Sequence, residues 1–373
     1  MKMNKTVFVL ISMLSCLSFN ISIACTAFII RNNETFLVGR NYDYRSNQGV
    51  IIINPRNMEK IALPFPNEVS ARWISKYGSV TFNAIAREEP IEGINEKGLM
   101  IAGLWLNDTK LPEPDSRPAT DDLQWIQYML DNCVDINEVI SECNNVRISN
   151  QSQSKIHYFL SDAQGNFAII EFIDGKFLYF LNDNSTNAFI CNDSFEKSSR
   201  DLKKYVSWGG AEPILSRFEK YSSEEAVVIG AEMIKNFTYS EPIESYAFNI
   251  LKNVEAPRST PNDKEYGSQW SVVYDCKNIR FSFKTLDNKE KRTIDLKTID
   301  FDNCKNIMAL SISNSKADNI YSQFNVFSPE ENLQMFKNGV RFFYNVQDLP
   351  PDLDKEISSI ALIPYTYKCV RKD

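Results

Sequence analysis

The stretch CTAFIIRNNETFLVGRNYD, residues 25–43, carries the strongest local indication of the fold. Apolar and β-favouring residues fill 26–30 and 35–38, and the turn-forming residues Asn32-Asn33-Glu34 separate the two runs. This pattern predicts a β-hairpin whose first strand starts directly after Cys25.

The first 24 residues have the composition of a signal peptide. Two lysines precede an apolar stretch at 7–17 that is too short to span a bilayer, and Ser22-Ile23-Ala24 fits a cleavage site. A buried N-terminal helix is the weaker alternative, because the apolar stretch has no polar face. We therefore predict a signal peptide at 1–24, a single domain at 25–373, and export to the periplasm or the medium.

Cleavage at this point would leave Cys25 as the N-terminal residue, with a thiol and a free α-amine together. An α-amine has a pKa of about 7.7 to 8.0 and a thiol one of about 8.5, so the amine is a suitable base for the thiol. This is the arrangement of an N-terminal nucleophile. Lipid attachment to Cys25 is the alternative, but Ser22 stands where a lipoprotein signal normally has an aliphatic residue.

Composition excludes several classes of function. The chain has 373 residues, 43% of them hydrophobic, and its 41 Lys and Arg against 48 Asp and Glu include no basic run, which disfavours nucleic acid as a partner. No stretch after the signal peptide approaches the roughly 20 apolar residues of a membrane span. His157 is the single histidine and no Cys-x-x-Cys occurs, so we expect no metal and no cofactor, and a packed structural role for His157.

The chain has eight cysteines. With Cys16 in the signal peptide and Cys25 in a chemical role, the other six allow many disulfide pairings, which the sequence cannot distinguish. A pair of Cys133 and Cys143, on either side of a short helical segment, is the local pairing that we expect.

The remaining pattern predicts strands at both ends of the chain and helices in the middle. Expected strands lie at 26–30, 35–38, 50–53, 80–84, 99–104, 157–160, 167–172, 176–181, 188–191, 268–274, 280–285 and 292–295, and expected helices at 122–131, 135–143, 199–206, 222–236 and from 328 onward. The helix at 222 opens with Ser222-x-x-Glu225, a capping box. An α+β fold of stacked sheets flanked by helices follows.

Several motifs together resemble the choloylglycine hydrolase family, which comprises bile salt hydrolases and penicillin V acylases. They are Cys25-Thr26-Ala27-Phe28, Gly39-Arg40-Asn41-Tyr42-Asp43, Asn95-Glu96-Lys97-Gly98-Leu99 with Ala102-Gly103-Leu104, Cys191-Asn192-Asp193-Ser194, Ser216-Arg217-Phe218, and Gln269-Trp270-Ser271-Val272-Val273-Tyr274-Asp275 with Phe281-Ser282-Phe283-Lys284-Thr285. The resemblance implies the αββα N-terminal nucleophile hydrolase fold, with two stacked antiparallel sheets, and hydrolysis of linear amide C–N bonds through an acyl-enzyme intermediate.

The resemblance also implies roles for individual residues. Cys25 is the nucleophile, Arg40 favours its thiolate, and Asp43 orients the α-ammonium. Asn192 matches the family's oxyanion donor and Arg217 its active-site arginine. Without the resemblance, we would expect Arg40 and Asp43 to form an exposed pair. Asn192 would then be a turn residue and Arg217 an ordinary surface residue.

Trp105 departs from the family pattern, because bile salt hydrolases have Asn there and penicillin V acylases commonly Tyr. Trp105 is a candidate substrate-binding residue through its backbone amide, its indole N–H or an apolar acyl pocket, and core packing is the competing account. Trp73 and Phe82 could join such a pocket, although core packing suits them better. The implied substrates are small N-acyl amides: penicillin V, long-chain N-acyl homoserine lactones or conjugated bile salts, the last disfavoured by Trp105.

Two other classes were weighed against an amidohydrolase. A papain-like protease needs a cysteine at a helix start and a catalytic histidine, which Cys25 and a lone His157 do not match. A secreted non-catalytic ligand-binding protein of the same fold is disfavoured because every expected catalytic position is filled. The interval from Asn192 to Arg217 is shorter than in the Gram-positive relatives, where an inserted segment helps to build the tetramer, and the short form resembles the exported Gram-negative branch of the family. A homo-oligomer, tetramer or dimer, is therefore left open.

Overall fold

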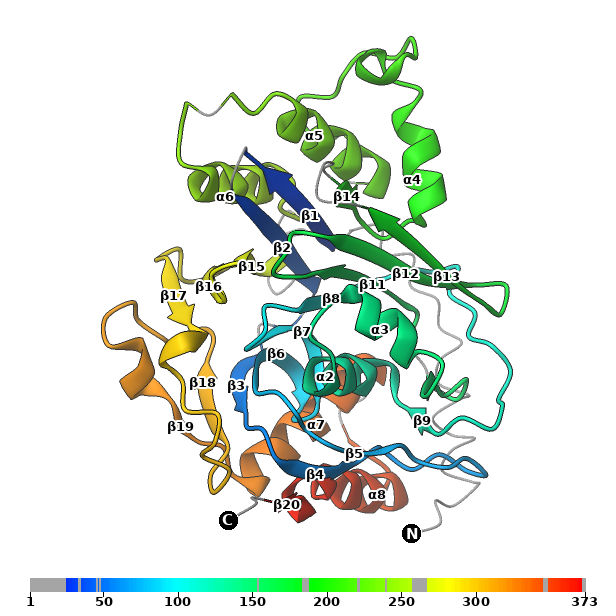
Figure 1. Cartoon of the computed structure of the whole chain (residues 1–373), viewed down its shortest axis with the longest axis vertical. Helices are drawn as coiled ribbons and strands as arrows, with labels where there is room; N and C mark the ends of the chain where they lie inside the picture. Colours follow the sequence, from blue (N-terminus) through cyan, green and yellow to red (C-terminus); the bar gives the residue numbers. More distant parts are fainter. Residues whose placement is uncertain are drawn as a thin grey trace.

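The computed structural model describes residues 25–32, 35–44, 46, 48–152, 154–182, 188–219, 222–238, 240–256, 267–344 and 348–370 (Figure 1). The predicted signal peptide at 1–24 lies outside these residues. None of the helices within the described ranges is long and apolar enough to cross a membrane.

The first of two large sheets contains the predicted hairpin. Its strands are β1 (Thr26–Arg31), β2 (Phe36–Tyr44), β14 (Ala188–Ile190), β15 (Gly267–Asp275), β16 (Arg280–Thr285) and β17 (Arg292–Asp295). Among the described residues they form an antiparallel sheet in the order β14-β1-β2-β15-β16-β17. The hairpin is confirmed, with Ala27 opposite Arg40.

The second large sheet is also antiparallel. Its strands are β3 (Val50–Asn54), β6 (Ser79–Ala86), β7 (Glu89–Asn95), β8 (Met100–Trp105), β11 (Ile156–Ser161), β12 (Phe167–Ile173), β13 (Lys176–Asn182), β18 (Met308–Ser311) and β19 (Asn325–Val326). Their order in the described chain is β13-β12-β11-β8-β7-β6-β3-β18-β19. Smaller sheets join β4 (Met58–Ile61), β5 (Arg72–Ile74) and β20 (Lys368–Cys369), and β9 (Ala119–Thr120) with β10 (Arg147–Ile148).

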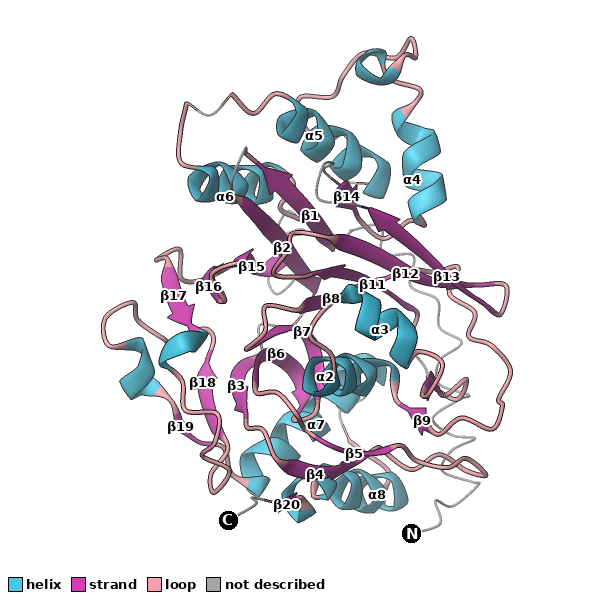
Figure 2. Cartoon of the chain, viewed as in Figure 1, coloured by secondary structure: helices cyan, strands magenta, loops and turns pink. Residues whose placement is uncertain are grey.

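Helices cover the outer faces of both large sheets. The α-helices of the described ranges are α2 (Asp122–Asn132), α3 (Ile136–Glu142), α4 (Phe195–Leu202), α5 (Ser223–Lys235), α6 (Ile243–Asn253), α7 (Pro329–Tyr344) and α8 (Pro351–Ala361). α5 and α6 pack on the first sheet, and α2 and α7 on the second, so the strands lie between two helix layers (Figure 2). This confirms the αββα fold.

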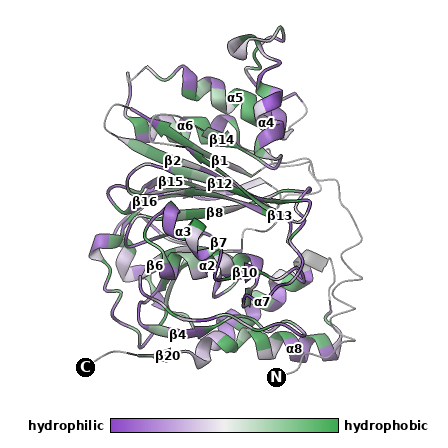
Figure 3. Ribbon diagram, turned by 45° about the vertical axis from the view of Figure 1, so that its right-hand side comes forward, coloured by the Kyte–Doolittle hydropathy of each residue, from purple (hydrophilic) through white to green (hydrophobic). Residues whose placement is uncertain are grey.

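Side-chain alternation along β1 separates two hydrophobic clusters. Ala27 and Ile29 point into the large core shared by the two sheets, whereas Phe28 and Ile30 pack toward α5 and α6. The strands between the helix layers are accordingly rich in green, hydrophobic residues in Figure 3. Cys25 belongs to the core between the sheets, so the start of β1 presents the thiol to the interior.

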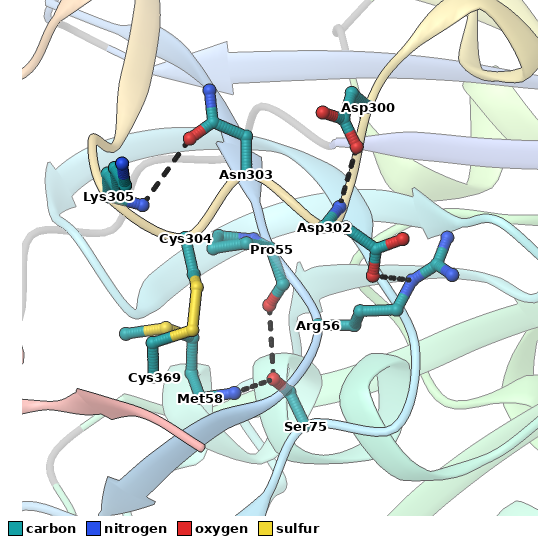
Figure 4. The surroundings of a disulfide bond; sticks show 10 residues. All are labelled: Pro55, Arg56, Met58, Ser75, Asp300, Asp302, Asn303, Cys304, Lys305 and Cys369. Atoms are coloured by element: carbon teal, nitrogen blue, oxygen red, sulfur yellow. Dashed lines mark hydrogen bonds and ion pairs between the residues drawn. A yellow bond between two sulfur atoms is a disulfide. The ribbon is translucent and has the colours of Figure 1, made fainter. Parts of the chain in front are cut away.

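The expected Cys133–Cys143 disulfide is wrong. Both residues are buried free thiols. Cys133 caps the end of α2 and Cys143 the end of α3, and each thiol is packed in the core with no disulfide partner in the described chain. Cys304 and Cys369 are joined instead, and the bond ties the loop after β17 to β20 beside Met58 (Figure 4).

Other differences from the sequence-based expectation are local. The helix expected at 199–206 is α4, which starts four residues earlier because Ser194 caps it by accepting the N–H of Lys197. The local sequence pattern does not predict β7, α6 or α8. The capping box of Ser222 and Glu225 is confirmed at the start of α5.

Candidate active site

Cys25 lies at the first position of the hairpin and is only 7% exposed. Its Sγ donates to the backbone carbonyl of Asp43 at 3.8 Å. Burial raises the pKa of the Cys25 thiol, while the charge of Arg40 and hydrogen bonds from Arg40 and the Asp43 backbone act in the opposite direction. The thiol is therefore inside the protein, next to a cation that favours the thiolate.

Arg40 is fully buried in the middle of β2 and reaches from the first sheet to the second. Its guanidinium donates to the carbonyl of Gly103 at 2.8 Å, to that of Thr26 at 3.4 Å, and to that of Asn41. Burial alone would lower the pKa of Arg40, but Cys25, Glu92 and Asp43 raise it. Arg40 is thus a fixed positive charge beside the thiol.

Asp43 is 6% exposed and stands across the ladder from Ser268 on β15. The Ser268 hydroxyl donates to Oδ1 of Asp43 at 2.5 Å and accepts the N–H of Ala256. Burial raises the pKa of Asp43 to about 7, against the hydrogen bond from Ser268 and the charge of Arg40. The structure therefore brings Asp43 to Cys25 and tunes its carboxyl group to titrate near neutrality.

Asn192 follows directly after β14, the strand that pairs with β1. Ala27 is opposite Ile190 in that antiparallel ladder, so continuing the register by two residues brings Asn192 alongside Cys25. Asn192 is half-buried. A neutral amide at this place is suited to donate to an oxyanion that forms at the thiol.

Trp105 ends β8, with an exposed fraction of 37%, and its indole N–H donates to Asn107 at 2.8 Å. The amide of Leu106 donates to Lys155 on the β11 side. Successive N–H groups of a strand point to opposite edges, so the Trp105 N–H points away from β11. The Gly103 carbonyl, two residues earlier, points to the same edge as the Trp105 N–H and accepts a hydrogen bond from Arg40. The indole stays at the surface, and the backbone amide is directed toward the Arg40 side.

Arg217 is not brought to this cluster. It is exposed on the loop after α4, and no hydrogen bond or ion pair joins it to Cys25 or Arg40 within the described chain. Trp73 and Phe82 are core residues: the Trp73 indole donates to Asp131 at 2.7 Å, and Phe82 packs on Trp270, Phe281 and Phe283.

Glu92 on β7 is a site residue that the sequence analysis missed. It is fully buried, its carboxylate accepts from the Trp270 indole at 2.7 Å and from the Tyr274 hydroxyl at 2.9 Å, and its charge acts on Arg40. Burial raises the pKa of Glu92, against the charge of Arg40 and these two hydrogen bonds. The one feature of the sequence that could have indicated Glu92 is its position, as an acidic residue three positions before Asn95.

The Asn95 motif itself shapes a turn. The Asn95 amide donates to the carbonyls of Leu130 and Cys133, its side-chain oxygen accepts the N–H groups of Lys97 and Leu99, and Gly98 takes a φ of 87°. A side chain at Gly98 would also meet the Cys276 carbonyl at 2.4 Å. This motif therefore joins β7 and β8 to α2.

Comparison with known proteins assigns the chain to the hydrolases of linear amide C–N bonds. The model of the family described as linear amide C–N hydrolases, choloylglycine hydrolase family, matches residues 25–212, about half of the chain. The chain belongs to that family, and the match begins at Cys25.

Individual relatives agree with this assignment. Penicillin V acylase from Pectobacterium atrosepticum is 26% identical over 316 residues, which is 75% of this chain and 83% of that protein. Penicillin V acylase from Agrobacterium tumefaciens has a similar structure, with a TM-score of 0.68 at 24% identity over 82% of this chain and 98% of that one. A mutant of conjugated bile acid hydrolase from Clostridium perfringens gives 0.60 at 22% identity, over 75% and 94%. At these identities the two solved structures establish the fold alone.

Proposed function

We propose that Cys25, exposed as the N-terminal residue by removal of 1–24, is the nucleophile of an amidohydrolase. The observation that carries the proposal is the position of its thiol, at the start of the central hairpin, in the core between the sheets and under the charge of the buried Arg40. The charge of Arg40 favours the thiolate of Cys25, which a cysteine packed among apolar side chains alone lacks.

The proposed reaction uses Cys25 at the start of the hairpin, Asn192 after β14 and Trp105 at the end of β8. The α-amine of Cys25 takes the thiol proton, and the sulfur attacks the amide carbonyl carbon. The Asn192 side chain and the Trp105 backbone N–H donate to the oxyanion. The C–N bond then breaks as the α-ammonium returns the proton to the departing amine. Loss of the amine leaves a thioester between the acyl group and Sγ of Cys25. Water, deprotonated by the α-amine, attacks its carbonyl carbon, the C–S bond breaks to release the carboxylic acid, and the α-ammonium returns the proton to the sulfur.

Arg40 and Asp43 support these steps without bond changes. Arg40 favours the thiolate by its charge, and Asp43, as a carboxylate, stabilises the α-ammonium between the two proton transfers. Arg217 takes a part only if its loop approaches the site with substrate, and its exposed position supports no role in these steps.

The proposed substrates are N-acyl amides with an apolar acyl group, penicillin V or long-chain N-acyl homoserine lactones ahead of conjugated bile salts. Two relatives bear the name penicillin V acylase, and a tryptophan replaces the asparagine of bile salt hydrolases at Trp105. Burial of an apolar acyl group contributes about 25 cal/mol per Å² and needs no partner for steroid hydroxyls.

Export is part of the same proposal. The family match starts at Cys25, and a disulfide such as Cys304–Cys369 persists in an oxidising compartment. Fractionation of cells of the source organism, followed by detection of the protein, tests it: we expect the periplasm or the medium, and a cytoplasmic protein that retains residues 1–24 contradicts it.

The enzyme assay compares the three substrate classes for the mature protein, Cys25→Ser and Cys143→Ser. Cys143 is a buried thiol at the end of α3 and serves as the control. We expect the wild type and Cys143→Ser to hydrolyse penicillin V or acyl homoserine lactones, and Cys25→Ser to lose activity but stay folded. Full activity of Cys25→Ser contradicts the assignment of Cys25 as the nucleophile. A preference for glycocholate or taurocholate contradicts the proposed order of substrates.

A further inference from the structure

His157 is fully buried on β11, as expected, but its two ring nitrogens connect different parts of the fold. Nδ1 lies 3.1 Å from Oε1 of Glu171, its neighbour on β12, and Nε2 lies 2.8 Å from the backbone carbonyl of Cys191. The side chain thus runs from the second sheet to the end of β14, which belongs to the first sheet.

Hydrogen-bond chemistry fixes the direction of the contact between His157 and Cys191. A backbone carbonyl only accepts, so Nε2 of His157 carries a proton and donates to Cys191. Glu171 Oε1 also accepts the backbone N–H of Phe195, at 2.7 Å. His157 therefore donates to the Cys191 carbonyl, and Glu171 accepts from the Phe195 N–H. Both partners lie on the segment that leads from β14 into α4.

These two bonds hold the chain on both sides of Asn192. Cys191 precedes Asn192 by one residue, and Phe195, the first residue of α4, follows it by three. The ladder between β1 and β14 contributes a further restraint before Asn192, through Ile190 and Ala27. The segment that carries the amide is short and is anchored at each end, so the place of Asn192 relative to Cys25 depends on these anchors.

We propose that His157 and Glu171 are positioning residues for amide hydrolysis, which act by holding Asn192 at the oxyanion. This inference rests on the proposed function of Cys25 and Asn192. In this role neither His157 nor Glu171 transfers a proton to the substrate. A donor displaced by about 1 Å costs on the order of 10²-fold in rate, and losing an oxyanion donor about 10²- to 10³-fold.

Two matched pairs of variants isolate the effect. The amide nitrogen of Gln reaches the place of Nε2 and that of Asn the place of Nδ1, so His157→Gln keeps a donor for Cys191 and His157→Asn loses it. Glu171→Gln keeps an acceptor for the Phe195 N–H and Glu171→Ala loses it. The second pair decides the question if His157→Asn does not fold.

The readouts are kcat and KM for penicillin V and the rate at which iodoacetamide alkylates Cys25. Alkylation displaces iodide without forming an oxyanion, so it reports the thiolate and not Asn192. We expect His157→Asn and Glu171→Ala to lower kcat by about 10- to 100-fold, with KM within about threefold and alkylation at the wild-type rate. His157→Gln and Glu171→Gln should stay within about fivefold of the wild-type kcat.

Opposite results overturn the inference in separate ways. Equal losses in both members of a pair, or alkylation that slows in step with kcat, indicate general disruption of the fold. An unchanged kcat in His157→Asn or Glu171→Ala contradicts the positioning role and leaves the proposed function of Cys25 intact. A wild type whose amide hydrolysis survives complete alkylation of Cys25 contradicts both.

Discussion

Replacement of Cys304 and Cys369 by serine removes the covalent link between the loop after β17 and the C-terminal strand β20. The bond closes a separation of 65 residues. In the chain-entropy account, a disulfide that closes a loop of that length lowers the conformational entropy of the unfolded chain. This stabilises the folded protein by about 4 kcal/mol at 25 °C. Cys304 is half-buried and Cys369 exposed, so the substitutions leave no core cavity to add to this value.

Urea unfolding of the double variant and of the oxidised wild type measures the difference. We expect the free energy of unfolding to fall by about 4 kcal/mol, and dithiothreitol to destabilise the wild type but not the variant. Cys133→Ala combined with Cys143→Ala is the control that dithiothreitol must destabilise as much as the wild type. A double variant within about 1 kcal/mol of the wild type, or a mapped Cys133–Cys143 bond, refutes this assignment. Amide hydrolysis should persist, because the bond lies on the small sheet with β4 and not beside Cys25.

Three further predictions concern the site. Because burial raises the pKa of Asp43 to about 7, protonation of Asp43 should add to the fall in kcat/KM below about pH 7 that protonation of the α-amine of Cys25 also causes. Asp43→Asn should be much less active and keep only the α-amine's part of this fall, and an unchanged profile in the variant argues against the assignment. Arg40→Gln should slow alkylation of Cys25 at pH 7 by about tenfold, since Arg40 lowers the pKa of the thiol; an equal rate excludes that role. Trp105→Asn should raise kcat/KM for glycocholate relative to penicillin V, and an identical ratio removes the Trp105 side chain from specificity.

Local patterns predicted much of the fold. The hairpin of β1 and β2 and the capping box of Ser222 and Glu225 were found because their residues are close in sequence and their period or spacing is diagnostic. β7 was missed because Glu92 interrupts its apolar pattern. Trp270 and Tyr274 donate hydrogen bonds to the buried carboxylate of Glu92. Both residues are far from Glu92 in the sequence, so a local pattern cannot reveal these contacts.

The candidate site divides in the same way. Arg40 and Asp43 meet Cys25 through the same hairpin, so their grouping follows from the local sequence. Asn192 comes alongside through the pairing of β14 with β1, which only the family resemblance could anticipate. That resemblance also suggested Arg217, which is exposed. The wrong disulfide shows the limit of spacing alone, because Cys133 and Cys143 end two successive helices and are nevertheless free thiols in the core.

Peptide mapping by mass spectrometry of the active enzyme after partial alkylation tests the central claim most directly, because it reads the N-terminus and the nucleophile together. The account predicts a mature chain that begins at Cys25, a single carboxamidomethyl group on that residue, and a fraction of alkylated Cys25 equal to the fraction of activity lost. An active enzyme that retains a residue before Cys25, or activity loss that follows alkylation of Cys191, would contradict it.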